Sequence, residues 1–345
     1  MNGSDSLGDR LKKYEYISTS RQLMPNCPIY ARIDGRAFHT FCDGLTKPYS
    51  KAFIQAMQDT CKYLVKETTA VLGYVQSDEI SLGWTDTQHC PFDGRVQKLE
   101  SVLASMASAY FVKHLHHDAP RIFGPKRSDY DTGGEYTKAM DDYTLFANDN
   151  ETMRCKSIFN PPCFDCRVFN VPSMDELANA FLWRENDAIK NSITGMALNF
   201  YSHNELQGKD SDEKIHMMRM KGYCFYEDTD PAFMRGTFYH RENYLKALTN
   251  EEVDRIPKKQ RENLEYSEDG YTLFLPNNRV EKVKPNTYYC WRSHIVSMNL
   301  PYRLTDIKNK EDVLFNGAEA VLNKGNPMFN LSTRQGERHG TKIFD

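Results

Sequence analysis

The segment Val71-Leu-Gly-Tyr-Val-Gln-Ser-Asp-Glu-Ile-Ser-Leu-Gly-Trp84 contains two short apolar runs with four polar residues between them. Short runs rich in β-branched and aromatic side chains, bounded by polar residues, are typical of strands. The polar string from Gln76 to Glu79 is short enough to join the two runs directly. We therefore expect a β-hairpin whose tip carries Asp78 and Glu79.

The flanking segments predict an antiparallel sheet with helices packed on it. Strands are expected over Pro28-Ile-Tyr-Ala-Arg-Ile-Asp34 and Arg167-Val-Phe-Asn-Val171. Helices are expected after Ser50, over 96–110 and after Ser173, where apolar residues recur at spacings of three and four and the serines can cap. The order strand, helix, strand, strand, helix, strand is the ferredoxin-like arrangement also used by polymerase palm domains. It is an α+β fold with the helices on one face of the sheet.

The chain of 345 residues is long enough for two domains, at about 150 residues per domain. We expect a polar N-terminal lead-in over 1–27, a palm-like domain over 28–240 and a C-terminal extension over 241–345. Residues 118–162 contain prolines, glycines and charges without a period, so they predict a long insertion or surface loop.

Composition excludes several classes of protein. With 44 Lys+Arg against 47 Asp+Glu, no global basic field indicates nucleic acid, so any such site must be a local patch. No apolar run reaches the roughly 18 residues of a membrane span. The N-terminus lacks an apolar signal core, and nine scattered cysteines favour reduced thiols in a cytoplasmic protein.

Two acidic residues fall at chain reversals of the predicted sheet. Asp34 ends the first strand before Gly35, which predicts a tight turn, and Asp78 lies at the hairpin tip. If the strand and the hairpin are neighbours, the two carboxylates meet and repel unless a cation intervenes, and hard oxygen ligands suit Mg²⁺. Gly35 can add its carbonyl because no side chain covers it. Two such ions clamp the oxygens that react in nucleotidyl transfer.

Two reservations apply to this interpretation. Adjacent strand residues point to opposite faces, so only one of Asp78 and Glu79 is expected to face Asp34. Asp-Gly and Ser-Asp-Glu are also common turn sequences, so two ordinary polar turns remain an alternative.

Cationic residues near these turns are candidates for binding a triphosphate. Arg95 and Lys98 lie three apart at a predicted helix start, hence on one face, where the helix dipole adds positive potential. Lys47, between Thr46 and Pro48, is a third candidate. The alternative for each is a solvated surface charge.

A longer set of motifs resembles the tRNA(His) guanylyltransferase family and its Thg1-like relatives. In order and spacing, the set comprises Arg32-Ile-Asp-Gly-Arg-Ala-Phe-His39, Thr46-Lys-Pro48, Gln76-Ser-Asp-Glu79, residues 92–110, Asp165-Cys-Arg-Val-Phe169, Trp183-Arg184, Leu206-Gln-Gly208 and Arg235-Gly-Thr237. The resemblance covers residues 25–240.

The resemblance implies an enzyme that adds nucleotides to the 5′ end of tRNA, opposite in direction to ordinary polymerases. ATP or GTP would activate the 5′-phosphate, and the 3′-hydroxyl of an incoming GTP would then attack it. Asp34, Asp78 and the carbonyl of Gly35 would hold two Mg²⁺ ions, with Glu79 as a further catalytic residue. Nucleotide contacts are implied for Asp34, Gly35, Arg36, Ala37, Phe38, His39, Lys47, Ser77, Asp78, Arg95, Lys98 and Asn191. The family also implies a homo-oligomer, a tetramer.

The helix after Ser173 departs from the family pattern. Members that act strictly on histidine tRNA carry His-Ile-Asn-Asn, whereas this chain has Ala188-Ile-Lys-Asn191. The resemblance therefore leans toward the Thg1-like relatives, which repair truncated tRNA 5′ ends by templated pairing. The same helix carries the polar stripe Arg184, Asp187, Asn191 and Thr194, a pattern typical of a solvated face.

Two other functions remain open. A nucleotidyl cyclase would share the palm and the two-metal chemistry but make a soluble cyclic product. A non-catalytic RNA-binding module would not need the carboxylates.

Overall fold

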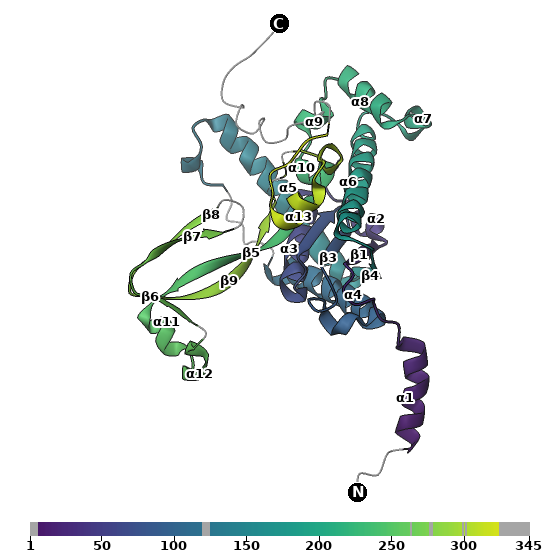
Figure 1. Ribbon diagram of the computed structural model, residues 1–345. Coiled ribbons are helices and arrows are strands. Elements are labelled where there is room, and N and C mark those ends of the chain that lie inside the picture. The colour runs from purple at the N-terminus through teal and green to yellow at the C-terminus, as the bar shows by residue number, and fades with distance from the viewer. Residues whose placement is uncertain are drawn as a thin grey trace. The chain divides into compact units, whose positions relative to one another are not determined.

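A computed structural model describes residues 6–118, 125–262, 264–275, 279–298, 300 and 302–323. The chain divides into two compact units, Met1–Phe238 and Tyr239–Asp345, and Figure 1 labels their elements. Parts of the predicted lead-in (1–5), insertion (119–124) and C-terminal extension (324–345) lie outside the described residues. Within the described ranges, no helix has the length and apolar character needed to cross a membrane.

The first unit is built on an antiparallel sheet with the strand order β4-β1-β3-β2. Its strands are β1 (Ile29–Arg36), β2 (Leu72–Gln76), β3 (Glu79–Trp84) and β4 (Cys163–Asn170). The predicted hairpin is confirmed, with Ser77 and Asp78 as its two-residue connection. The palm-type antiparallel sheet is confirmed as well.

The predicted tight turn at Asp34-Gly35 is wrong. Both residues lie inside β1, which continues to Arg36 because its last residues pair with the start of β4, Gly35 with Phe164 and Arg36 with Cys163. The hairpin tip lies beside the same residues, since the amide of Gly35 donates to the carbonyl oxygen of Asp78 at 3.0 Å. The end of β1 is therefore held from both sides.

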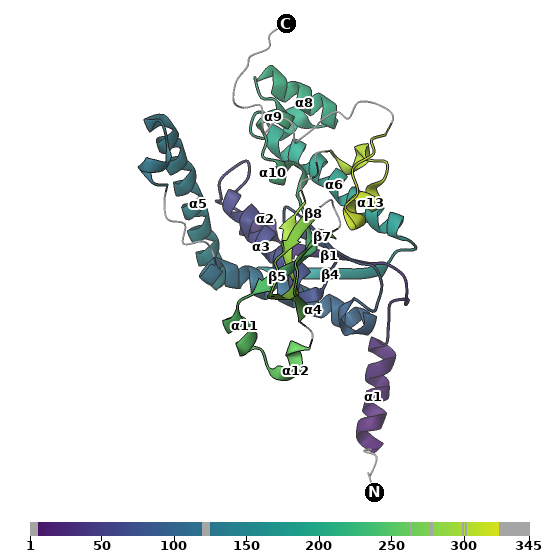
Figure 2. The same ribbon diagram turned by 60° about the vertical axis from the view of Figure 1, so that its left-hand side comes forward.

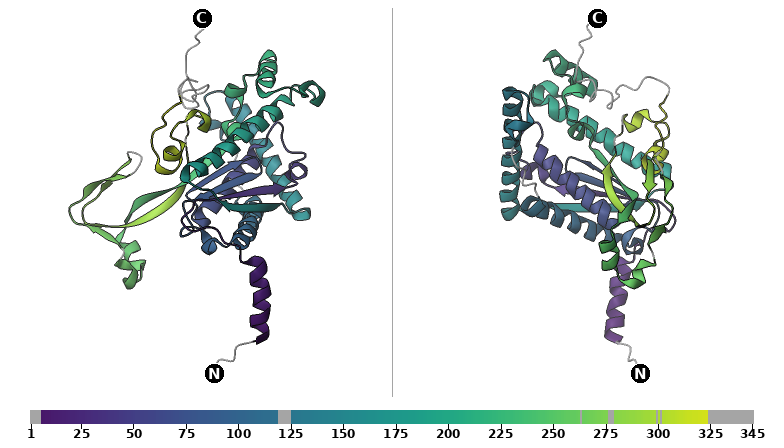
Figure 3. Two further views of the ribbon diagram at one scale, coloured as in Figure 1. Left: turned by 45° about the vertical axis from the view of Figure 1, so that its right-hand side comes forward. Right: turned by 90° about the vertical axis from the view of Figure 1, so that its left-hand side faces the viewer.

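Helices cover both faces of this sheet (Figure 3). Helices α3 (Lys51–Thr68) and α4 (Val96–Lys113) pack on one face, and α6 (Met174–Ala197) packs on the other. Two glycines permit the close approach, because an added Cβ at Gly73 would lie 2.3 Å from Val65 of α3 and one at Gly83 would lie 3.1 Å from Phe181 of α6. The predicted placement of all helices on one face therefore does not hold for α6, because Tyr30 and Gly83 of the opposite face pack against its Phe181.

The predicted helix starts at Ser50 and Ser173 are confirmed. The Ser50 hydroxyl accepts a hydrogen bond from the amide of Phe53, and the Ser173 hydroxyl accepts one from the amide of Glu176. Each bond satisfies an amide that would otherwise lack a partner in the first helical turn. Both helices therefore begin where local sequence directs them to begin.

The loop predicted within 118–162 is wrong over most of its length. Residues Gly133–Phe159 form α5, a helix of 27 residues that packs on α3. The residues that looked like helix breakers lie near its two ends. At its start, the side chains of Thr132 and Glu135 form a capping box. The buried residues of this helix are few, namely Asp149, Met153 and Ser157. So short a buried stripe leaves little apolar periodicity to detect.

The first unit also contains shorter helices and helical turns. They are α1 (Ser6–Thr19), α2 (Phe38–Phe41), η1 (Pro91–Gly94), η2 (His114–Asp118), η3 (Arg127–Asp129), α7 (His203–Leu206), α8 (Ser211–Met220), α9 (Phe225–Asp228) and α10 (Pro231–Arg235).

The second unit is mainly β-structure (Figure 2). Strand β5 (Thr237–Leu248) begins at the end of the first unit and pairs antiparallel with β9 (Thr287–Ser297), which also pairs with β6 (Glu265–Ser267). A two-stranded sheet, β7 (Tyr271–Leu275) with β8 (Arg279–Val283), packs its Val283 and Leu273 with Leu245 and Tyr289. The described helices here are α11 (Asn250–Arg255), α12 (Lys258–Arg261), η4 (Leu304–Asp306) and α13 (Lys310–Asn316).

Phe181 tests whether α6 is needed to cover the second face. Its ring is fully buried and lies edge-on to Tyr30 at 5.3 Å. We expect Phe181→Ala to lower the free energy of unfolding by about 3–5 kcal/mol, because a large ring leaves a cavity in a packed interface. Phe181→Leu should cost less, and Lys190→Ala, exposed on the same helix, should stay within about 0.5 kcal/mol. Urea unfolding measures all three, and equal stability of Phe181→Ala and wild type would contradict this packing.

Candidate active site

The structure brings Asp34, Gly35 and Asp78 together at one end of the sheet. Asp34 is the cross-strand partner of Glu79, and the Gly35 amide bonds the Asp78 carbonyl. A Cβ added to Gly35 would lie 2.9 Å from the Cβ of Asp78 and 2.5 Å from the ring of Phe38. Only a glycine permits such close packing at this position.

The Asp78 carboxyl lies in a strained electrostatic environment. Burial raises its pKa, and the negative charge of Asp34 raises it further, against hydrogen bonds from its own backbone and from Ser77 that lower it. Ser77 also has a φ of 46°, in the left-handed region. A divalent cation between the two carboxylates would remove their repulsion, and two carboxylates with a peptide carbonyl are oxygen donors of the kind Mg²⁺ accepts.

These residues fit magnesium by donor type, but they do not form a complete protein cage. Within the part of the chain that the structure describes, no three His, Cys, Asp or Glu side chains group as a metal site. Magnesium usually retains several waters and binds through one or two carboxylates plus substrate phosphates. A pair of aspartates is therefore sufficient only if the substrate supplies further ligands.

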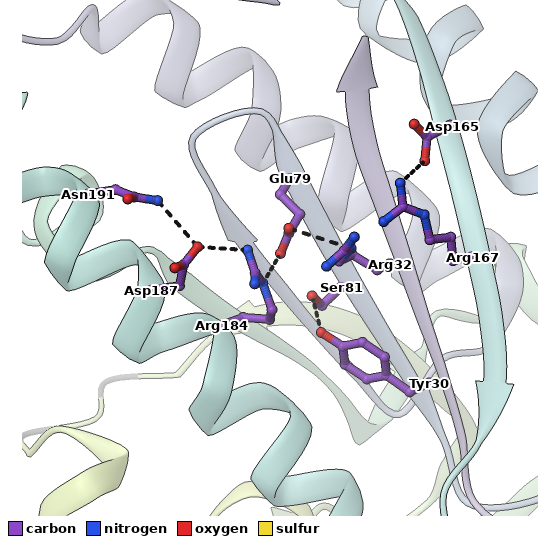
Figure 4. Close-up of polar contacts among 9 residues, drawn as sticks. All are labelled: Tyr30, Arg32, Glu79, Ser81, Asp165, Arg167, Arg184, Asp187 and Asn191. Atoms are coloured by element: carbon purple, nitrogen blue, oxygen red, sulfur yellow. Dashed lines mark hydrogen bonds and ion pairs between the residues drawn. The ribbon is translucent and has the colours of Figure 1, made fainter.

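Glu79 is held in a buried ionic network (Figure 4). Arg184 Nε donates to Glu79 Oε1 at 2.6 Å, and Arg32 Nε lies 3.8 Å from Glu79 Oε2. Arg184 Nη2 also donates to Asp187 at 3.0 Å, and Asn191 donates to the same carboxylate at 3.3 Å. Burial raises the pKa of Glu79, and Arg184 opposes that shift. The network commits the Glu79 carboxylate to two arginines and connects the start of β3 to α6.

The strand-alternation argument for Asp78 and Glu79 does not apply. Asp78 lies in the hairpin connection, not in a strand, while the pairing of Asp34 with Glu79 places Glu79 on the same face as Asp34. The polar stripe on α6 predicted a solvated position for Arg184. This prediction is wrong, because Arg184 is buried. The sequence around Arg184 is polar, Glu185-Asn186-Asp187, and does not indicate its distant partner Glu79.

A second buried ion pair lies next to the first, but here α6 provides the carboxylate and α10 provides the arginine. Glu185, next to Arg184 on α6, is fully buried and accepts from Arg235, which is itself buried. Tyr74 donates its hydroxyl to the Arg235 carbonyl at 2.8 Å. The motif Arg235-Gly-Thr237 therefore joins α6 to β2, and it does so outside the candidate site.

A cavity of about 230 Å³ adjoins the hairpin tip. Three residues with predicted nucleotide contacts line it together, namely Ser77, Lys47 and Asn191. A second cavity of about 410 Å³ shares the segment 46–49 and extends toward α5. The first of these cavities is large enough for a nucleobase, with one apolar wall from Phe53 and Phe233.

In the turn after β1, the side chain of Phe38 is buried, whereas those of Arg36 and His39 are exposed. Ala37 has a φ of 57° and precedes α2. The ring of Phe38 is buried against Phe111 and Phe164, so a nucleotide can meet only its backbone. His39 is exposed and lies 3.0 Å from the Thr40 hydroxyl. Arg36 is the exposed last residue of β1.

Arg95 and Lys98 do not lie with the carboxylates. They begin α4 next to Gln22, whereas Phe111, near the other end of α4, packs on Phe38 beside the site. Sixteen helical residues span about 24 Å, so most of the length of α4 separates the two groups. Lys98 Nζ lies 4.9 Å from the Phe92 ring. Nucleotide binding by these two residues stays a prediction.

Helix α5 holds the loop that forms one wall of the 230 Å³ cavity. Asp149, a buried residue of α5, accepts from the amide of Thr46 at 3.0 Å and from its hydroxyl at 3.1 Å. Lys156 donates to the carbonyl oxygens of Thr40 and Phe41 at 3.3 and 3.1 Å. This support was not predictable from the sequence, because the weak apolar periodicity of 133–159 did not indicate a helix.

The fold and the site together define a nucleotidyltransferase of the polymerase-palm class, with an antiparallel sheet whose strands carry paired aspartates at one end. The family model of the tRNAHis guanylyltransferases matches residues 8–172. The chain is 31% identical to the tRNA(His) guanylyltransferase of Neurospora crassa over 269 residues, 71% of this chain and 79% of that protein. The chain belongs to the tRNA(His) guanylyltransferase family.

Two further comparisons agree with this assignment. The tRNA(His) guanylyltransferase of Debaryomyces hansenii is 22% identical over 275 residues, 73% of this chain and 88% of that protein. A bacterial tRNA(His) guanylyltransferase (Thg1)-like protein, solved in complex with ATP, is 32% identical with a TM-score of 0.52. The match covers 68% of this chain and 88% of that chain.

Arg184→Met tests the buried network through its pH dependence. A carboxyl whose pKa is raised on folding binds more protons in the folded state, so stability falls as the pH rises past the ordinary glutamate pKa of about 4.3. Without Arg184, the pKa of Glu79 should rise further. We expect a loss of about 3–5 kcal/mol near neutral pH and a smaller loss near pH 4.

Urea unfolding from pH 4 to pH 8 measures this profile. The double variant Glu79→Gln with Arg184→Met is the matched control, since it removes the ionisable group and should flatten the profile. A pH-independent loss in Arg184→Met would show that Glu79 is not the group left uncompensated.

Lys156→Met tests the support that α5 gives to the loop. Loss of charged hydrogen bonds, each contributing about 1.5–3 kcal/mol, should speed amide exchange over residues 40–47 by about tenfold or more. Hydrogen–deuterium exchange should show no change in α6. Lys138→Met, exposed on the same helix, is the control. Unchanged amide exchange over residues 40–47 would mean that Lys156 does not stabilise the loop.

Proposed function

We propose that this protein adds nucleotides to the 5′ end of tRNA. The observation that carries the proposal is the juxtaposition of Asp34 and Asp78 beside a cavity lined by Ser77, Lys47 and Asn191. Family membership supports it, because the named relatives are tRNA(His) guanylyltransferases and the bacterial relative was solved with ATP.

The proposed reaction has two transfers at the same pair of carboxylates. The 5′-phosphate of the RNA attacks the α-phosphorus of ATP or GTP, releasing pyrophosphate and leaving a nucleotidylated 5′ end. The 3′-hydroxyl of an incoming GTP, or of another templated nucleotide, then attacks the 5′-phosphate. The nucleoside monophosphate leaves and a new phosphodiester bond forms.

Two Mg²⁺ ions bound here would offset the charge that develops on the phosphoryl oxygens. Asp34, Asp78 and the Gly35 carbonyl are the groups that would hold them. Burial and the charge of Asp34 raise the pKa of Asp78, and a bound metal ion would oppose that shift by favouring the ionised carboxylate.

The remaining residues bind and orient the nucleotide. Lys47 provides a cation and Ser77 a hydroxyl where the cavity meets the hairpin tip, which suits the triphosphate. The apolar wall suits the base. Asn191, held by Asp187, provides an amide at the α6 side. Glu79 acts by holding the hairpin tip through Arg184.

The substrate proposal follows the departure at 188–191. Ala188 and Asn191 both line the cavity, so the change from His-Ile-Asn-Asn alters a wall of the site. We therefore propose templated repair of truncated tRNA 5′ ends over strict guanosine addition to histidine tRNA. We also propose residues 28–240 as the catalytic domain, and a cytoplasmic homo-oligomer, a tetramer, as the working form.

Asp34→Asn and Asp78→Asn test the reaction. Incubation with Mg²⁺, ATP, labelled GTP and a 5′-truncated tRNA should place label in the RNA for the wild type. Each variant should lose this activity by at least about a hundredfold, because each lacks a charge that stabilises the transition state. Thermal unfolding should show that both variants fold.

Asp141→Asn, an exposed residue of α5, is the charge-matched control and should keep full activity. Label in a cyclic nucleotide would favour the cyclase. Tight RNA binding without any product would favour the RNA-binding module. Wild-type turnover by both aspartate variants would show that the reaction occurs elsewhere in the protein.

A further inference from the structure

The sheet face under α6 carries three ordered rows of side chains. The register of β3, β1 and β4 gives an acidic row, a row with two arginines and a row with two aromatic rings. From the carboxylate end inward, they are Glu79–Asp34–Asp165, Ser81–Arg32–Arg167 and Gly83–Tyr30–Phe169.

The β4 part of this face is open to solvent. Phe164 and Val168 point to the other face and are buried, whereas Asp165, Arg167 and Phe169 are exposed. Strand β4 is the edge strand of the sheet on this side. The side chains of Asp165, Arg167 and Phe169 are therefore available to a ligand, and Asp165 lies directly beside Asp34.

The two arginines occupy directly paired positions, where like charges destabilise a sheet. Arg32 is compensated by Glu79 at 3.8 Å. Arg167 lies 3.8 Å from Asp165, but their side chains are 58% and 57% exposed, and such pairs contribute little. Figure 4 shows the two arginines on neighbouring strands, each directed toward a carboxylate. A phosphate would relieve this repulsion, and planar guanidinium groups match its oxygens.

An exposed tryptophan lies beside Arg32 and Arg184. Trp183 of α6 is 52% exposed, and its ring lies 5.7 Å from the guanidinium of Arg32 and 4.6 Å from that of Arg184. Because Arg184 is fixed by Glu79 and Asp187, the indole is held at the rim of the open face. An indole in this setting offers a base a surface on which to stack.

We propose that Arg167 and Trp183 form the docking site for the 5′-terminal nucleotides of the RNA strand. Arg167, with Arg32, binds the phosphodiester that follows the reacting 5′-phosphate, and Trp183 stacks on a terminal base. Arg32 lies two residues before Asp34 in β1, a separation of about 7 Å along the strand. A phosphodiester bound by Arg32 would therefore lie one nucleotide from a 5′-phosphate at Asp34. The inference rests on the proposed function and adds the residues that receive its RNA substrate.

The placement of the two ligand surfaces supports this assignment. The cavity with Lys47 and Ser77 lies at the β2–β3 tip, on one side of Asp34. Arg167 lies on β4, on the other side of Asp34. A reaction that joins a nucleotide to an RNA end needs two substrates that meet at the carboxylates. The sheet provides one surface on each side of them.

Binding of 5′-phosphorylated tRNA without nucleotide, followed by fluorescence anisotropy across a salt series, tests the proposal. Arg167→Gln should weaken binding and reduce the slope of log affinity against log salt by about one. Trp183→Ala should weaken binding by about tenfold, and Trp183→Phe should restore most of it. ATP affinity should stay at the wild-type value in all three variants.

Lys66→Gln on α3, at the opposite face, is the control for loss of a positive charge, and thermal unfolding checks the fold of each variant. Wild-type RNA affinity and salt slope in both Arg167→Gln and Trp183→Ala would overturn the proposal. A loss of ATP affinity equal to the loss of RNA affinity would overturn it too, since the surface would then serve the nucleotide. If these variants lose RNA affinity as expected but the wild type adds no nucleotide, the docking site stands and the proposed reaction fails.

Discussion

The buried ion pair between Glu79 and Arg184 is the constraint on which the site depends. It ties the first residue of β3 to α6, and the residue before it is Asp78. The hairpin tip is thus fixed by a contact that the carboxylates of Asp34 and Asp78 do not themselves make. Asp34 and Asp78 can then be held close in spite of their repulsion, because the cost is met by packing and pairing elsewhere in the unit.

Local signals predicted the elements that surround the site. The hairpin was predictable because its apolar runs and polar tip are contiguous, and the starts of α3 and α6 because Ser50 and Ser173 act within one helical turn. The juxtaposition of Asp34 with Asp78 followed from topology, because the first strand and the hairpin are neighbours as expected. Only the expected turn was wrong, since Asp34 and Gly35 lie inside β1.

Contacts between distant parts of the chain were not predictable in this way. The extension of β1 to Arg36 depends on pairing with β4, whose sequence begins only at Cys163. The burial of Arg184 depends on Glu79, which is 105 residues away. Helix α5 buries few of its residues, so its pattern resembled that of a loop. In each case the decisive partner lies outside any local window of sequence.

Helix α5 binds the loop over residues 40–47 mainly through the backbone of the loop, so the path of the loop and the chemistry of its side chains can vary separately. Lys156 binds main-chain carbonyls and Asp149 binds a main-chain amide, so most of this attachment does not depend on which side chains the loop carries. Substitutions at positions such as Cys42 or Lys47 can alter what the wall recognises while its path is preserved. Under the proposed function, selectivity for different nucleotides could therefore diverge among descendants of this chain without rebuilding the scaffold.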